Sequence, residues 1–285
     1  LERGGLYSVY VGSSAIGQGL ETAFAQIAAD ALEVTIDRIR GVFHGTTSYV
    51  GDGYGAYHSR SVVMGGSAIL DAAAKLRETI RTRAAQRLNC QASAVEIFEG
   101  MKVVGPDGSS IALNELSGES ISAEGAFLNK KHTYTYGAHA AHVAVDPKLG
   151  HVELLDYVVV ADCGRIINPL TVHGQTVGSV VQGLGGAMME HLVYDQDGQL
   201  LTGSLADYLI PTASDFPNIR AVMLEQHPSP INPLGAKGAG EGGIIAAGGV
   251  MANAVANALS SLQVQPRELP LTPTRIWELV QAARS

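Results

Sequence analysis

The sequence predicts an α+β fold of two lobes, built from mixed sheets, hairpins and packed helices. Segments with β-branched runs or period-two alternation are interspersed with segments whose apolar residues recur at helical spacing. The two kinds do not alternate steadily, as they would in a doubly wound α/β fold. The 285 residues are 46% hydrophobic and 16% charged, so the chain can bury a large core.

The first lobe is predicted over residues 1–128. Helical spacing of apolar residues, as at Ala23, Phe24 and Ile27, indicates its helices, and β-branched runs that end at turn formers indicate its strands. The expected helices are residues 20–32 and 61–88, and the expected strands are residues 6–11, 39–43, 95–98 and 101–104. Residues 45–57 are rich in glycine and tyrosine without periodicity and are expected to form a loop. A mostly polar stretch, residues 117–131, marks the lobe boundary.

The second lobe is predicted over residues 129–285. It is expected to open with a hairpin, because residues 138–145 and 151–160 flank a turn at residues 146–150. The remaining segments follow from the same rules. They are a helix at 172–190, a second hairpin turning at 195–198, a strand at 219–224, a glycine-rich loop at 233–243, and helices at 244–262 and 274–283.

Composition excludes several classes of protein. The net charge of −8 argues against a generic nucleic-acid binder. Two cysteines, Cys90 and Cys163, exclude a disulfide framework and a thiolate iron–sulfur cluster held by this chain alone. The most apolar stretch, residues 244–262, carries polar asparagines and serines, so no membrane span is expected. No secretory leader is recognised. The predicted location is the cytoplasm, with a periplasmic complex as the alternative.

Three glycine-bearing loops each precede or open a predicted helix: Gly17-Gln18-Gly19, residues 55–61 and residues 238–243. Glycine lets the backbone approach a ligand closely, and free N–H groups at helix starts bind anions. We expect the three loops to converge on one concave site that suits a bulky anionic cofactor. The alternative is that each is simply a tight turn.

The last of these loops carries a single carboxylate. Glu241 is the one charged residue from Gly238 to Ala258. If Glu241 is buried, its pKa should rise, which suits a general base near neutral pH; the alternative is an exposed loop residue. Gly238, Gly240 and Gly243 match G-x-G-x-x-G, but no strand precedes them and no acidic residue follows at the required distance, so a dinucleotide site is rejected.

Other candidate sites have simpler interpretations. His139 and His142 lie three apart in a predicted strand, which places them on opposite faces and favours packing over a shared metal. Asp195 and Asp197 begin like a calcium loop, but the later positions do not fit, so a hairpin turn is expected. A hydrolase that uses Glu241 is disfavoured because the chain has no G-x-S-x-G motif.

Several blocks follow one another along the chain in a distinctive order. They are Gly17-Gln18-Gly19-x-x-Thr22, Gly55-x-Tyr57-x-Ser59-Arg60-Ser61, Asp162-x-Gly164-x-x-Ile167-Asn168-Pro169 with Gly174-Gln175 and Gln182-Gly183, Asp207-Tyr208-x-x-Pro211-Thr212, and Lys237-x-x-Gly240-Glu241. Together they resemble the C-terminal half of the molybdenum-cofactor subunit of the xanthine dehydrogenase, aldehyde oxidase and carbon monoxide dehydrogenase family. The resemblance covers nearly the whole chain, and the ordered set is far more specific than any single block.

The resemblance implies a two-lobed domain that binds a molybdenum–pterin cofactor, either Mo-molybdopterin or its cytosine dinucleotide. It implies no direct protein ligand to the metal, which the pterin dithiolene holds. Glu241 is implied as the catalytic base. The implied cofactor-binding residues are Gly17, Gln18, Gly19, Tyr57, His58, Ser59, Arg60, Ser61, Gln175 and Gly240. Arg60 has an equally good structural interpretation, in which it pairs with an acid to hold its loop.

The implied activity is that of a molybdenum hydroxylase. Such an enzyme inserts water-derived oxygen into a C–H bond of an aldehyde or N-heterocycle, and a hydride passes to the sulfido ligand of the metal. The implied partners are the missing N-terminal half of the subunit, iron–sulfur and flavin subunits or domains that carry [2Fe-2S] and FAD, and a small-molecule substrate. The rival hypothesis is a cofactor-binding half-subunit that is inactive alone and acts as an assembly or binding module.

Two departures from the family pattern bear on the substrate. His58 stands where many members have a small residue, so the loop around the metal is expected to have a different shape. Gly242 and Gly243 follow the catalytic glutamate, where xanthine dehydrogenases tend to have Pro-Pro. This is more similar to the carbon monoxide dehydrogenase branch and argues against a purine substrate.

Overall fold

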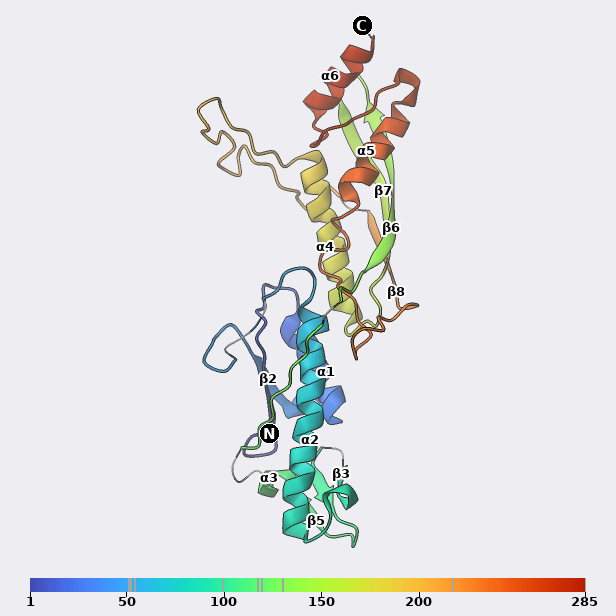
Figure 1. Ribbon diagram of the computed structural model, residues 1–285. Helices are drawn as coiled ribbons and strands as arrows, with labels where there is room; N and C mark the ends of the chain where they lie inside the picture. The colour runs from blue at the N-terminus through green and yellow to red at the C-terminus, as the bar shows by residue number, and fades with distance from the viewer. Residues whose placement is uncertain are drawn as a thin grey trace. The chain divides into compact units, whose positions relative to one another are not determined.

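Two parallel strand pairs, each with a helix between its strands, organise the chain (Figure 1). The computed structural model describes residues 1–50, 53, 55–98, 100–116, 118, 120–129, 131–216 and 218–284. Residues 51, 52 and 54 of the predicted loop, and residues 117, 119 and 130 of the predicted boundary, lie outside these ranges. By internal contacts the chain divides into unit 1 (Leu1–Tyr134, Gly164–Asn168 and Pro228–Gly238) and unit 2 (Thr135–Cys163, Pro169–His227 and Ala239–Ser285).

Unit 1 begins with a β-α-β arrangement. Strand β1 (Tyr7–Tyr10) pairs in parallel with β2 (Ile39–Phe43), and helix α1 (Leu20–Leu32) connects them ahead of a short 3₁₀ turn, η1 (Ile36–Arg38). Parallel strands need such a crossover because their ends lie at opposite edges. The sequence predicted all three elements but not their pairing.

A long helix follows, as predicted for residues 61–88. It opens with a π-helical turn, η2 (Val62–Gly66), and continues as α2 (Ser67–Leu88). A 3₁₀ turn, η3 (Ala92–Ala94), leads to an antiparallel meander of β3 (Glu96–Phe98), β4 (Lys102–Val104) and β5 (Ser110–Ala112), after which comes the short helix α3 (Leu113–Leu116). The sequence reading missed β5 and α3, which are too short to show a period.

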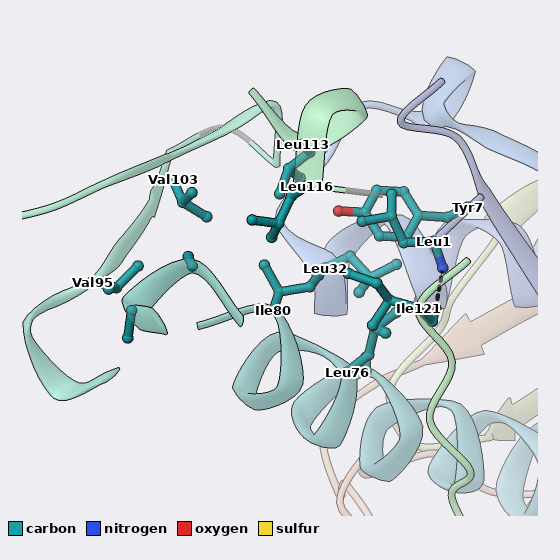
Figure 2. Packing of buried hydrophobic residues seen from close by; sticks show 13 residues of the cluster. Leu1, Tyr7, Leu32, Leu76, Ile80, Val95, Val103, Leu113, Leu116 and Ile121 are labelled. Carbon is teal, nitrogen blue, oxygen red and sulfur yellow. Dashed lines mark hydrogen bonds between the residues drawn. The ribbon is translucent and has the colours of Figure 1, made fainter. Parts of the chain in front are cut away.

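Helix α2 packs its apolar face against this meander. Leu76 and Ile80 lie in one cluster of buried residues with Val103 and Leu113 (Figure 2). The amino group of Leu1 donates a 2.8 Å hydrogen bond to the carbonyl oxygen of Ile121 at the edge of this cluster. The first residue of the chain is therefore part of the core.

Unit 2 is built on a three-stranded sheet. Strand β6 (Tyr136–Asp146) and β7 (His151–Asp162) form the predicted hairpin, with a bulge between His142 and Val143, and β8 (Ile219–Leu224) adds in parallel to β7. Helix α4 (Pro169–Met188) connects β7 to β8. The second predicted hairpin is reduced to an isolated bridge between Tyr194 and Leu200.

Two helices and a 3₁₀ turn complete unit 2. Helix α5 (Ala247–Ala258) starts three residues later than predicted and is followed by a 3₁₀ turn, η4 (Ser260–Leu262), and helix α6 (Pro273–Arg284). Helix α4 packs against β8, α5 packs against β6, and the two helices touch each other. Their buried side chains form one core with β7 and α6.

Two predictions concern domain organisation and membrane insertion. The predicted lobe boundary between residues 128 and 129 stays a prediction. By internal contacts, two segments that follow this boundary, Gly164–Asn168 and Pro228–Gly238, belong to unit 1. In the part of the chain that the structure describes, no helix combines the length and apolar character needed to cross a membrane.

We predict that Ile80→Ala lowers the free energy of unfolding by about 2–5 kcal/mol, because it leaves a cavity in a packed cluster. Ile80 is 1% exposed. Urea denaturation measures the change. Ile16→Ala is the matched control, since Ile16 is 76% exposed and its truncation should cost little. Equal losses for the two variants would contradict the assigned core.

Candidate active site

The predicted cofactor loop at residues 57–61 has an unusual backbone. His58 and Ser59 are consecutive non-glycine residues in the left-handed region, with φ of 56° and 51°. Each such residue costs on the order of 1–3 kcal/mol, and strain of this kind clusters at ligand-binding segments. The guanidinium of Arg60 lies over the ring of Tyr57, 4.0 Å from its centroid, which holds the loop across the strained pair. This contact gives Arg60 a structural partner in Tyr57, while its predicted role in cofactor binding stays a prediction.

The connection between β1 and α1 lies beside this loop. Ser13 Oγ donates a 3.2 Å hydrogen bond to Ser61 Oγ. In the same connection, Gln18 Oε1 accepts from the backbone N–H of Ile16 at 2.6 Å, and Gln18 Nε2 donates to the carbonyl of Ser14 at 3.2 Å. The Gln18 amide therefore shapes its own loop and retains one N–H and one lone pair for a ligand.

The glycine-rich loop approaches the same place within unit 1. A Cβ on Gly238 would lie 2.5 Å from the carbonyl oxygen of Ser59 and 2.6 Å from its Cβ, so only glycine fits there. Gly164 forms a bridge with Ala236, and the N–H of Arg165 donates to the carbonyl of Gly235 at 3.0 Å. Unit 1 thus brings together three predicted segments, which contain Gln18, Ser59 and Gly238.

The far end of the glycine-rich loop is fixed to α4 in unit 2. A Cβ on Gly243 would lie 2.2 Å from Ser179 Oγ, 2.6 Å from the carbonyl oxygen of Thr176 and 2.8 Å from the backbone nitrogen of Val180. Ser179 Oγ accepts a 3.1 Å hydrogen bond from the N–H of Gly243. Gln175 is on the same turn of α4, partly exposed. Unit 2 therefore places the end of the Glu241 loop against the middle of α4, one turn or less from the predicted cofactor residue Gln175.

Glu241 is two residues before this anchor. Its side chain is exposed in this chain and Gly240 is partly exposed, which corresponds to the second of the two alternatives weighed for Glu241. The expected convergence of Gln18, the residue 57–61 loop, Gln175 and Glu241 on one site stays a prediction, because these residues are divided between units 1 and 2.

Some blocks prove to carry structural roles. Tyr208 Oη donates a 2.5 Å hydrogen bond to Glu190 Oε2, which ties the Asp-Tyr-x-x-Pro-Thr block to the end of α4. That bond raises the pKa of Tyr208. Asp162 is buried, and its Oδ2 accepts from the N–H of His227 at 3.1 Å. Asn168 Nδ2 donates to Gln26 Oε1 at 3.0 Å. These hydrogen bonds hold the loops in which the blocks lie, a role that the sequence pattern did not indicate.

Sequence reasoning missed Ser179 and Thr176, which hold the Glu241 loop. Both are buried on α4, and Thr176 Oγ1 donates to the carbonyl of Val172 at 2.9 Å. The sequence did contain an indication of this role. Two small hydroxyl residues interrupt the apolar face of a predicted helix, and a buried hydroxyl group needs a hydrogen-bond partner. Among the residues that the structure describes, no three His, Cys, Asp or Glu side chains gather into a metal site.

His139 and His142 lie on opposite faces of β6, as predicted: His139 is partly buried and His142 is exposed. His139 Nδ1 is 2.7 Å from Tyr157 Oη. Burial lowers the pKa of His139 below its usual value.

Comparison with known proteins agrees with this fold. Residues 1–217 match the family described as the molybdopterin cofactor-binding domain. The chain is 37% identical to subunit gamma of the 6-hydroxypseudooxynicotine dehydrogenase complex of Paenarthrobacter nicotinovorans, over 99% of this chain and 37% of that protein. The chain belongs to the molybdopterin cofactor-binding domain family, that of the molybdenum-binding subunits of xanthine dehydrogenases and carbon monoxide dehydrogenases.

Two solved structures are similar along nearly the whole chain. A Cu,Mo-carbon monoxide dehydrogenase superposes with a TM-score of 0.83 at 27% identity, over 96% of this chain and 36% of that one. Quinoline 2-oxidoreductase from Pseudomonas putida 86 superposes with a TM-score of 0.80 at 34% identity, also over 96% of this chain and 36% of that one. The chain spans about a third of the length of the relatives it matches.

We predict that Gly243→Ala destabilises the protein by about 1–3 kcal/mol, the usual cost of overpacking. The new methyl group would strike Ser179 and the backbone of α4. Thermal unfolding measures the effect. Gly242→Ala is the control, since a Cβ there meets only Thr135 Cγ2, at 3.9 Å. If the two variants have the same unfolding temperature, the loop does not lie as close to α4 as described.

The lowered pKa of His139 predicts a pH dependence of stability. The unfolded chain binds a proton at His139 near pH 6.5, whereas the folded chain resists it, so unfolding becomes easier as pH falls. From pH 7 to pH 5 the wild type should lose more unfolding free energy than His139→Gln does. Urea titrations across this range test the prediction, and equal slopes for the two proteins would contradict it.

Proposed function

We propose that this chain is the part of a molybdenum–pterin-dependent hydroxylase that binds the cofactor and supplies its general base. The observation that carries the proposal is the Glu241 segment. Gly238 and Gly243 leave no room for a Cβ beside their neighbours, and the exposed carboxylate of Glu241 lies between these two fixed points in the chain. A carboxylate on a fixed backbone is what general-base catalysis requires.

The residues of this chain fit an anionic pterin cofactor. Helix α1 begins at Leu20, and its N-cap residue Gly19 makes no side-chain hydrogen bond to the first turn. The backbone N–H groups at the start of a helix attract phosphate and other anions. The partly exposed loop at Ser59 and Ser61 adds hydroxyl groups. The amides of Gln18 and Gln175 offer both donors and acceptors to a heterocycle edge. We therefore assign cofactor contacts to residues 17–19, residues 57–61, Gln175 and Gly240.

When bound, the molybdenum centre supplies the two-electron oxidation and the water-derived oxygen. The chain's own residues do the rest. A carboxylate oxygen of Glu241 would accept the proton that must leave the water-derived oxygen before it can act as a nucleophile. The strained turn at His58 and Ser59 would hold its part of the cofactor in a fixed position on unit 1. Closure of the site in the complete protein would exclude water, which raises the basicity of Glu241.

An N-heterocycle is the substrate class that we favour over an aldehyde. Quinoline 2-oxidoreductase is 34% identical to this chain, and subunit gamma of the 6-hydroxypseudooxynicotine dehydrogenase complex is 37% identical. Gly242 and Gly243 after the base leave the loop without the side chains that Pro-Pro would place there. Activity on a purine is not expected from this chemistry.

The proposed partners follow from electron flow. Two cysteines cannot hold an iron–sulfur relay, so we assign [2Fe-2S] and FAD to partner chains or domains and the remaining pocket wall to the rest of the molybdenum subunit. The relative in Paenarthrobacter nicotinovorans is itself named as one subunit of a complex. The alternative is a cofactor-binding module that does no chemistry alone. Turnover by the isolated chain loaded with cofactor and an artificial electron acceptor would exclude that alternative.

We predict that Glu241→Gln in the complete enzyme retains the cofactor and lowers kcat by about 10²–10⁴-fold, because glutamine copies the shape of the base without its basicity. Steady-state kinetics on N-heterocycles and a molybdenum assay measure the two effects. Glu278→Gln, an exposed site on α6, serves as the control and should keep full activity. Retention of more than about a tenth of wild-type kcat by Glu241→Gln would refute the base assignment.

A further inference from the structure

His44 lies where the two parallel strands of unit 1 end, and none of the family blocks contains it. The register of β1 and β2 pairs Tyr10 with Phe43, and the N–H of Val11 donates to the carbonyl of Phe43 at 3.0 Å. Parallel pairing puts the carboxyl ends of both strands at one edge of the sheet, which is where ligands bind in folds of this kind. His44 directly follows β2 at that edge, and the connection that contains Gln18 leaves β1 there.

The imidazole of His44 bonds to that connection and to the helix after it. The N–H of Ala15 donates a long hydrogen bond of 3.4 Å to Nδ1, and Nε2 lies 2.9 Å from Glu21 Oε1 in the first turn of α1. A backbone N–H can only donate, so Nδ1 accepts and the ring proton is on Nε2, which donates to the carboxylate. The pKa of the Glu21 carboxyl is lowered, first by its own backbone N–H and then by the bond to His44, which agrees with an ionised acceptor.

We propose that His44 is a positioning residue that fixes the cofactor loop around Gln18 by tying Ala15 to the first turn of α1. The inference rests on the proposed function only for its consequence, which is retention of the cofactor. Within the loop, Gln18 Oε1 accepts from the N–H of Ile16, and Gln18 Nε2 donates to the carbonyl of Ser14. Those local bonds shape the loop, whereas the bond from Ala15 to His44 attaches it to the end of β2.

Attachment of the loop bears on how tightly the cofactor is held. A mobile loop would have to be ordered each time Gln18 meets a ligand, and that ordering costs conformational entropy. A loop that His44 already holds in place avoids this cost, which is the general advantage of a preorganised site. The His44 side chain is 21% exposed, so water competes only in part for its two ring nitrogens.

Two measurements on the 285-residue chain test the tie without cofactor, partner or turnover. Imidazole ¹⁵N chemical shifts report which ring nitrogen carries the proton. In alkaline buffer, where the ring is neutral, they should place the proton of His44 on Nε2. Hydrogen exchange at the amide of Ala15 reports how often its bond to the ring opens.

Three variants separate the two bonds of the ring. His44→Leu removes both, His44→Asn keeps an acceptor at the position of Nδ1 but is too short to reach Glu21, and His44→Gln keeps a donor at the position of Nε2. Exchange at Ala15 should rise about two- to fivefold in His44→Leu and His44→Gln, as expected for one long hydrogen bond, and stay near the wild-type rate in His44→Asn. His132→Leu, at an exposed histidine of the same unit, is the matched control and should leave Ala15 unchanged.

In the complete enzyme, His44→Leu should lose bound molybdenum faster during dialysis than the wild type does, and His44→Asn should restore its retention. A ring proton on Nδ1 in the wild type, or unchanged Ala15 exchange in His44→Leu, would overturn the inference. Faster exchange throughout unit 1 would do the same, because His44 would then be a general packing residue. Faster Ala15 exchange with unchanged molybdenum retention would support the tie and count against the cofactor contact assigned to Gln18.

Discussion

The close approach of glycine backbone to its neighbours is the constraint on which the candidate site depends. At Gly238, in unit 1, the neighbour is Ser59, and at Gly243, in unit 2, it is the middle of α4. At both positions main-chain atoms are among the neighbours, and these cannot move aside as a side-chain tip can. Each glycine therefore holds one end of the short segment that carries Glu241 against its own unit.

Such a segment solves a physical problem for a general base. A glutamate on an ordinary flexible loop would sample many directions, and ordering it for each turnover would cost conformational entropy. Here close packing and hydrogen bonds remove most of that freedom in the folded state. The same packing leaves the carboxylate itself exposed in this chain, so its burial depends on what covers it in the complete enzyme.

The rest of the fold supplies rigid points for these contacts. The strained pair His58 and Ser59 is followed directly by the π-helical turn η2 and the long helix α2, whose far end is buried in the core of unit 1. In unit 2, α4 holds Gly243 through Ser179. Several family blocks turn out to brace loops rather than to present groups to a ligand, as Asp162 and Tyr208 show.

The sequence by itself determined the elements and the inventory of chemical groups. Helix α1 and strand β2 have the predicted bounds, because their signals lie within a few residues of one another. The glycine blocks and the isolated glutamate were visible for the same reason. Only the tertiary structure decided which strands pair, why Gly238 and Gly243 must be glycine, and which groups hold the loop. Ser179 and Gly243 are 64 residues apart, and contacts over such separations leave no periodic trace in a single sequence.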